Sequence, residues 1–85
     1  MVLYMGFLMT RSTPLDRHLG AKIAYYRTLR HFTQAELAEK LQLVGCNLTR
    51  NMVNKIESGY RATSIFEIDC FVEVLGISYD QLFEK

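Results

Sequence analysis

The sequence has little of what a turn-rich or disulfide-stapled fold needs. One proline and five glycines are too few for the many turns of a small β domain. Two cysteines, Cys46 and Cys70, cannot build the framework of several disulfides that is typical of small secreted domains. The chain also has no secretory signature, so we expect reduced thiols and a cytoplasmic protein. Cys70 lies in an apolar, periodic stretch and is expected to be a small core residue.

Signals for a membrane segment, a metal site or an enzyme are lacking as well. The apolar residues 1–10 follow no basic region and are too short to cross a bilayer. The candidate metal ligands are His18, His31, Cys46 and Cys70. They do not have the paired spacing of zinc ligands, so no metal site is expected. Because no Ser/His/Asp grouping, carboxylate pair or glycine-rich phosphate loop is found, we expect no catalytic residues, no cofactor and no enzymatic activity.

Length and charge favour a single globular domain that can bind a polyanion. The 85 residues are 49% hydrophobic and 22% charged, which is an ordinary globular balance. The net charge of +1 hides an uneven distribution. Residues 1–61 carry nine Lys or Arg against four acids, whereas residues 62–85 carry one Lys against five acids. A basic part can therefore face phosphates while an acidic part faces away, although chance segregation would give the same pattern.

Residues 1–12 are set apart from the domain expected over residues 13–85. The first ten, MVLYMGFLMT, are unusually apolar for a chain terminus. Three interpretations compete: a β-like arm that pairs with a neighbour, a disordered leader with Met9 as an alternative start, or a cloning artefact. The arm is favoured because so many exposed apolar residues would otherwise promote aggregation.

Capping signals and apolar periodicity predict five short helices and an all-α fold. The expected cap residues are Thr13, Thr33, Thr49, Ser64 and Ser78. The helices are expected to end near residues 30, 45, 59, 76 and 83. Helical spacing predicts that the following side chains recur on the inner faces: Leu15, Leu19, Ile23, Tyr26, Leu37, Ala38, Leu41, Met52, Val53, Ile56, Ile65, Ile68, Val72 and Leu75.

The third predicted helix has an outward face suited to reading DNA bases. This face is formed by Arg50, Asn51, Asn54 and Lys55, at spacing i, i+1, i+4 and i+5. Arg can pair with guanine, Asn with adenine, and Lys with guanine or a phosphate, and no carboxylate opposes them. Asn is a poor helix former, so local stability does not explain two of them. The alternative is a plain solvated face, which more often mixes Glu with Lys.

Two further segments are candidates for phosphate contacts. Thr33 and Gln34 lie at the start of the second helix, where free N–H groups and the helix dipole suit an anion. Tyr60 and Arg61 follow the third helix and can hold the DNA backbone on its far side. The alternatives are a simple helix cap for the first pair and a solvated loop for the second.

Three separated segments resemble, in order, the phage-repressor-like (XRE-type) regulators. RTLRHFTQAELAEKL (27–41) is similar to the family's first helix-turn-helix element and LTRNMVNKIESG (48–59) to its recognition helix. VLGISYDQLF (74–83) is similar to the last two helices. The resemblance covers about residues 15–83. It implies a compact five-helix DNA-binding domain that regulates transcription, by default as a repressor, and acts as a homodimer on near-palindromic double-stranded DNA.

The resemblance also assigns roles by position. Base-contacting positions match Arg50, Asn51 and Lys55, with Asn54 nearby. Phosphate-contacting positions match Thr33, Gln34, Tyr60 and Arg61. A structural ion pair that braces the first helix against the third matches Arg27 and Glu57. The sequence departs from the family at residues 42–47, which lengthen the turn between the second and third helices by about five residues and put the angle between them in question.

A protein-interaction module, such as the antitoxin of a toxin–antitoxin pair, is the rival function. The fourth predicted helix carries a second apolar set, Phe66, Cys70 and Val74, which could bury in a homodimer or against an unknown partner. The two functions are compatible, and the acid-free polar face of the third helix favours DNA.

Overall fold

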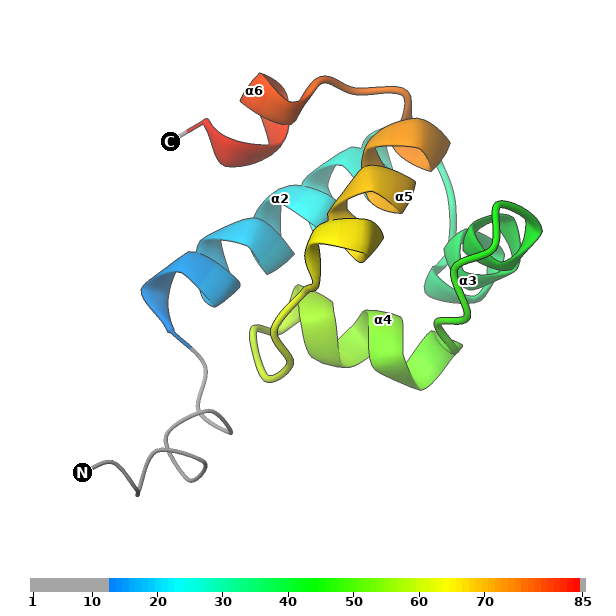
Figure 1. Cartoon of the computed structure of the whole chain (residues 1–85), viewed down its shortest axis with the longest axis horizontal. Helices are drawn as coiled ribbons and strands as arrows, with labels where there is room; N and C mark the ends of the chain where they lie inside the picture. Colours follow the sequence, from blue (N-terminus) through cyan, green and yellow to red (C-terminus); the bar gives the residue numbers. More distant parts are fainter. Residues whose placement is uncertain (1–12, 85) are drawn as a thin grey trace.

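The computed structural model describes residues 13–84 and contains five helices within them (Figure 1). They are α2 (Pro14–Leu29), α3 (Gln34–Leu43), α4 (Arg50–Glu57), α5 (Ile65–Leu75) and α6 (Tyr79–Phe83). No strand occurs in this part of the chain. The predicted all-α, five-helix fold is therefore confirmed, whereas the arm or leader predicted for residues 1–12 lies outside the described residues.

Each helix begins after the residue that the sequence predicts as its cap. Thr13, Thr33, Ser64 and Ser78 form capping boxes, in which the cap hydroxyl accepts from a backbone N–H and the side chain three residues later returns the contact. Thr49 accepts from the Met52 N–H, but a methionine cannot complete the box. Local sequence therefore determines where the helices start.

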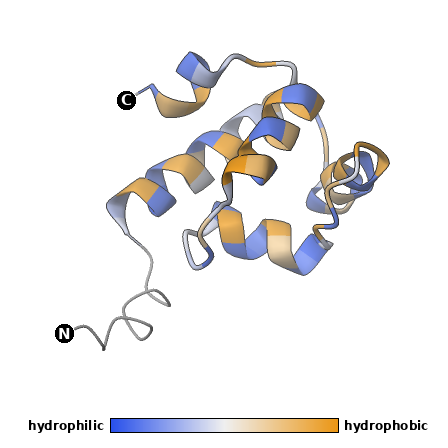
Figure 2. Cartoon of the chain, viewed as in Figure 1, coloured by the Kyte–Doolittle hydropathy of each residue, from blue (hydrophilic) through white to orange (hydrophobic). Residues whose placement is uncertain are grey.

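The helices enclose one hydrophobic core, and apolar and polar residues alternate around them (Figure 2). α4 packs against α2 and α3, while α5 packs against α3 and α2, and α6 closes against α2. The largest fully buried side chains are Phe71, Ile23, Leu37, Leu41, Leu48, Ile56, Leu75 and Leu82. Of the predicted inward residues, Leu19, Ile23, Tyr26, Leu37, Ala38, Leu41, Val53, Ile56 and Leu75 are buried.

Three predicted inward residues are exposed instead: Leu15 at 58%, Met52 at 38% and Ile65 at 84%. α5 shows the reason. Phe71, for which no inward position was predicted, is fully buried, so the inner face of α5 lies about one residue position away from the expected stripe. The second apolar set is also divided, since Cys70 is in the core, Phe66 is 57% exposed and Val74 is half-buried.

The long turn after α3 is held in place by the core. Gly45 adopts φ +90°, which reverses the chain, and the Cys46 N–H then donates to the Leu41 carbonyl at 2.9 Å. Cys46 and Leu48 are buried, and the Gln42 amide donates to the Leu48 carbonyl at 3.0 Å. The inserted residues thus return the chain to the core before α4 begins.

Both cysteines are free, buried thiols, as predicted for Cys70. Burial, followed by the neighbouring Cys70 thiol, raises the pKa of Cys46 to about 11. Residues 13–84 contain no cluster of three or more potential metal ligands. None of the helices over this stretch is long and apolar enough to cross a membrane.

Candidate nucleic-acid interface

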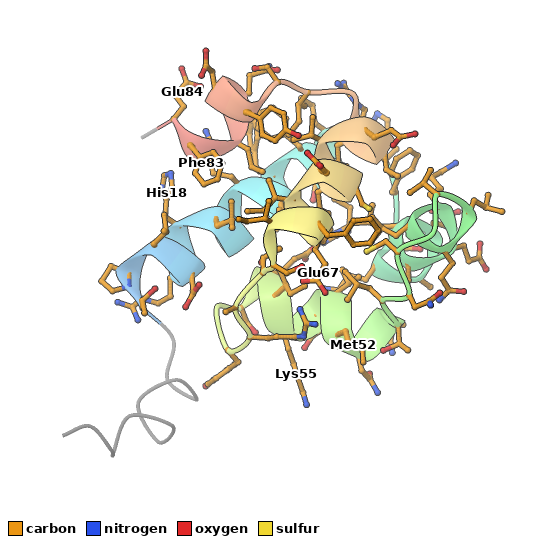
Figure 3. The ribbon with its side chains drawn as sticks, in the orientation of Figure 1. His18, Met52, Lys55, Glu67, Phe83 and Glu84 are labelled. Atoms are coloured by element: carbon orange, nitrogen blue, oxygen red, sulfur yellow. The ribbon has the colours of Figure 1, made fainter. Side chains whose placement is uncertain are left out.

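α4 presents opposite faces to the core and to solvent. On its inner face, Val53 and Ile56 are fully buried. Its outer face carries the four predicted base-contacting residues, Arg50, Asn51, Asn54 and Lys55, all exposed. Figure 3 shows Lys55 extending outward, away from the rest of the domain. The fold therefore brings these four residues onto one open surface, as their spacing predicts.

The outer face of α4 is free of internal partners over most of its length. Within residues 13–84, the side chains of Arg50, Asn51 and Lys55 make no hydrogen bond or ion pair, and Asn54 makes one long contact, Nδ2 to Gln34 Oε1 at 3.4 Å. The other four helices each have an acid in the first turn, whereas α4 has none. The positive end of the α4 dipole is thus left without a neutralising carboxylate.

A hydrogen-bonded network fixes α4 from behind. Arg27 pairs with Glu57 through two bonds, Nε to Oε2 at 2.7 Å and Nη2 to Oε1 at 3.0 Å. The Arg27 and Glu57 side chains are only 18% and 7% exposed. The remaining guanidinium nitrogen, Nη1, donates to the Phe32 carbonyl at 2.8 Å. The resemblance implied that Arg27 and Glu57 form an ion pair. The pair joins α2 to the end of α4, and the Phe32 contact joins α2 to the loop before α3.

Gln34 extends this network toward the outer surface. Its amide Nε2 donates to Glu57 Oε1 at 2.9 Å, and its Oε1 faces the Asn54 amide. The side chain is half-buried, so it contacts α4 rather than standing free at the helix start. Gln34 was predicted to contact a phosphate, and its contact with α4 was not predicted, because that contact depends on how α3 and α4 cross.

Thr33 caps α3 and leaves part of the helix start open. Its hydroxyl accepts from the Glu36 N–H at 3.0 Å, and the Glu36 carboxylate accepts from the Thr33 N–H at 2.8 Å. The hydroxyl proton of Thr33 and the N–H groups of Gln34 and Ala35 remain for an external acceptor, because first-turn N–H groups have no partner inside a helix.

The loop after α4 places Tyr60 and Arg61 differently. Tyr60 is 76% exposed, whereas the Arg61 guanidinium is bound to Glu67 of α5 by two bonds of 2.9 Å each. The hydrogen bonds from Arg61 are the main cause that lowers the pKa of the Glu67 carboxyl. Sequence reasoning missed Glu67 because its only visible signal was the Ser64 capping box, which it also completes.

Comparisons with known proteins agree with this geometry. A protein-family model described as "Helix-turn-helix" matches residues 23–82. The fold is similar to the clp gene regulator ClgR from C. glutamicum, with a TM-score of 0.74, 22% identity, and coverage of 85% of this chain and 86% of that one. No curated protein sequence matches the chain significantly.

Two restriction-modification controller proteins are also similar. C.AhdI from Aeromonas hydrophila has a TM-score of 0.71 and 26% identity, and the match covers 80% of this chain and 96% of that one. C.Esp1396I, whose tetramer has been solved in complex with its natural 35 base-pair operator, has a TM-score of 0.70 and 26% identity, with 85% and 88% covered.

Proposed function

The chain belongs to the helix-turn-helix family and is a DNA-binding transcriptional regulator, and from this premise we propose that it represses transcription by inserting α4 into the major groove of its operator. The observation that supports this docking is the outer face of α4, where Arg50, Asn51 and Lys55 are exposed, free of internal partners and unopposed by any acid. An α-helix fits the major groove, and a groove-facing surface must be polar, donor-rich and free of negative charge.

In this proposal the polar residues of α4 read base edges. Arg50 forms a bidentate pair with guanine, and Asn51 forms one with adenine. Lys55, in the last turn, reaches guanine or a phosphate. The contact with Gln34 already restricts the Asn54 side chain, so Asn54 loses less conformational entropy when it binds a base.

Phosphate contacts on both sides of α4 set its register in the groove. We assign one of them to the start of α3, where the Thr33 hydroxyl and the Gln34 N–H are available to an anion. The exposed Tyr60 and the neighbouring Arg61 supply the other. Arg61 can keep its bonds to Glu67 and donate from Nε, which is not engaged by that carboxylate.

We further propose that a cytoplasmic homodimer places two copies of α4 in successive major grooves, roughly 34 Å apart. The tetramer–operator complex of C.Esp1396I supports multivalent binding by this fold. The exposed apolar pair Ile65 and Phe66, at the start of α5, is suited to a contact between protomers. Free thiols at Cys46 and Cys70 fit a reducing compartment.

Selection of binding sites from random duplexes, followed by titration of the selected duplex, tests these assignments. Arg50→Ala or Asn51→Ala is expected to weaken binding by about 1–3 kcal/mol and to relax the sequence choice at one position, because one bidentate base contact is lost. Lys22→Ala on α2 removes a positive charge away from α4 and serves as the control. Stoichiometry in the same titration is expected to be two chains per duplex.

Unchanged affinity and sequence preference in folded Arg50→Ala and Asn51→Ala proteins would refute base reading by α4. Binding that does not weaken as salt rises would refute contact with several phosphates, since each neutralised phosphate releases counterions.

The two sides of the Arg61–Glu67 pair separate a phosphate contact from a structural one. Arg61→Gln and Glu67→Gln remove the same ion pair and are expected to lower stability similarly, by at most about 1 kcal/mol at this partly exposed position. Only Arg61→Gln is expected to weaken all duplexes about equally and to flatten the salt dependence. Equal effects of both variants on DNA affinity would show that Arg61 acts only by holding Glu67.

A further inference from the structure

Met52 is the one apolar side chain exposed on α4, a helix that lies entirely within the described residues. The other exposed residues of this helix are the four proposed to read bases: Arg50, Asn51, Asn54 and Lys55. The sequence predicts an inward Met52, yet it is 38% exposed, whereas Val53 and Ile56 are fully buried. The core therefore leaves part of this methionine in solvent, beside the polar face.

Met52 borders the part of α4 that is proposed to enter the major groove. It directly follows Asn51 and lies three residues before Lys55, a spacing that makes two side chains neighbours on a helix surface. Figure 3 shows Met52 and Lys55 on the same helix. On the opposite flank of α4, Asn54 faces Gln34 of α3. Met52 thus occupies the flank that points away from α3.

The hydrogen-bonding residues of α4 cannot recognise one of the groups that distinguish base pairs in the major groove. Guanine, adenine and cytosine are marked there by donors and acceptors, but thymine also carries a 5-methyl group, which makes no hydrogen bond. Recognition of this methyl group requires an apolar contact. The Met52 side chain is unbranched and polarizable, so it can adapt its shape to such a contact.

We propose that Met52 reads the 5-methyl group of a thymine that lies within one base pair of the adenine contacted by Asn51. This inference rests on the proposed docking of α4 in the major groove and extends base reading from guanine and adenine to thymine. Removal of one methyl group from water is worth about 0.8 kcal/mol, which corresponds to about a fourfold change in affinity. The contact also covers part of the exposed Met52 side chain.

Replacement of thymine by deoxyuridine in the selected operator tests this contact, because deoxyuridine lacks only the 5-methyl group. With the native chain, replacing the contacted thymine is expected to weaken binding about fourfold. With Met52→Ala, the thymine and deoxyuridine duplexes are expected to bind within about 1.5-fold of each other, because the partner of the methyl group is already lost. Met52→Leu keeps an apolar side chain of similar volume and is expected to restore most of the difference.

Thr49→Ser is the matched control. Serine keeps the hydroxyl that accepts from the Met52 N–H and caps α4, but it removes the exposed methyl group of Thr49. This variant is expected to keep the fourfold difference between the two duplexes. Thermal unfolding of each variant verifies that the domain is folded at the temperature of the titration.

Three results would overturn the role of Met52. The first is a selected operator without thymine within one base pair of the position that Asn51→Ala relaxes. The second is a native chain that binds every deoxyuridine duplex as well as the thymine duplex. The third is a difference that persists in Met52→Ala, and its loss in Thr49→Ser would assign the methyl contact to Thr49. Reduced affinity of Arg50→Ala and Asn51→Ala would still support docking of α4 in each case, whereas unchanged affinity of both would overturn the docking and the role of Met52 together.

Discussion

Glu57→Ala is expected to lower the free energy of unfolding by about 3 kcal/mol. The carboxylate is 7% exposed and accepts from Arg27 twice and from Gln34 once. Its removal leaves the Arg27 guanidinium, which is 18% exposed, with only the Phe32 carbonyl. A buried charge that loses its partner costs about 3–5 kcal/mol, and residual exposure places this case at the lower end.

Loss of Glu57 is also expected to disturb the outer face of α4, which we propose contacts DNA. The Gln34 amide loses its acceptor, and with it the contact that holds Gln34 beside Asn54. We therefore expect weaker operator binding even under conditions in which the variant is folded. Urea denaturation gives the change in stability, and titration of the operator at low temperature gives the change in affinity.

Two variants define the origin of this effect. Glu57→Gln keeps one oxygen for the guanidinium and is expected to lose less stability than Glu57→Ala. It therefore provides a folded protein for the DNA titration if the alanine variant is unstable. Glu73→Ala removes an exposed acid of α5 and is expected to change stability by about 0.5 kcal/mol or less. A loss for Glu57→Ala no larger than this control would mean that the Arg27–Glu57 pair is solvated and weak.

Gly20→Ala is expected to destabilise the domain by about 3 kcal/mol, although the same change in an exposed helix stabilises by up to about 1 kcal/mol. Gly20 is buried in α2 where α4 crosses it. A Cβ atom at this position would overlap the carbonyl oxygen of Ile56 and lie 2.8 Å from that of Glu57. Backbone atoms cannot move aside as a flexible side chain can, so α4 must shift away from α2.

Because Gly20→Ala displaces α4, it is expected to weaken operator binding as well as stability, unlike a variant that only strains the backbone. Gly45→Ala is the matched control, because Gly45 has φ +90° and no atom within 4 Å of an added Cβ. It is expected to cost about 1–2 kcal/mol in backbone strain and to leave operator affinity unchanged. Thermal unfolding and operator titration of both variants give the comparison. Stabilisation by Gly20→Ala would show that the helices are farther apart than described.

The residues at which the helices start could be predicted from local sequence alone. A cap residue and the side chain three positions later interact with backbone groups of the same turn, so the signal does not depend on the rest of the fold. The outward face of α4 was predictable for a similar reason, because Val53 and Ile56 identify its inner side and fix where Arg50, Asn51, Asn54 and Lys55 must lie.

The orientation of α5 could not be predicted in this way. Apolar residues occur around most of this helix, so periodicity permits more than one inner face. The side of α5 that carries Phe71 is buried in the core, where α5 packs against α3 and α2, and Ile65 is left in solvent. The space available in the packed core decides which side of α5 is buried, and local sequence patterns do not specify that space.

The sequence by itself determined five capped helices, an acid-free polar side on the helix that became α4, and membership of the helix-turn-helix family. The resemblance already implied the pair of Arg27 with Glu57, and only the tertiary structure decided the further partners of the two acids: Arg61 for Glu67, and Gln34 for Glu57. The physical reason is range. Capping and helical periodicity act within a few residues, whereas each of these contacts, except the short link from Arg61 to Glu67, joins segments brought together by burial of a shared core.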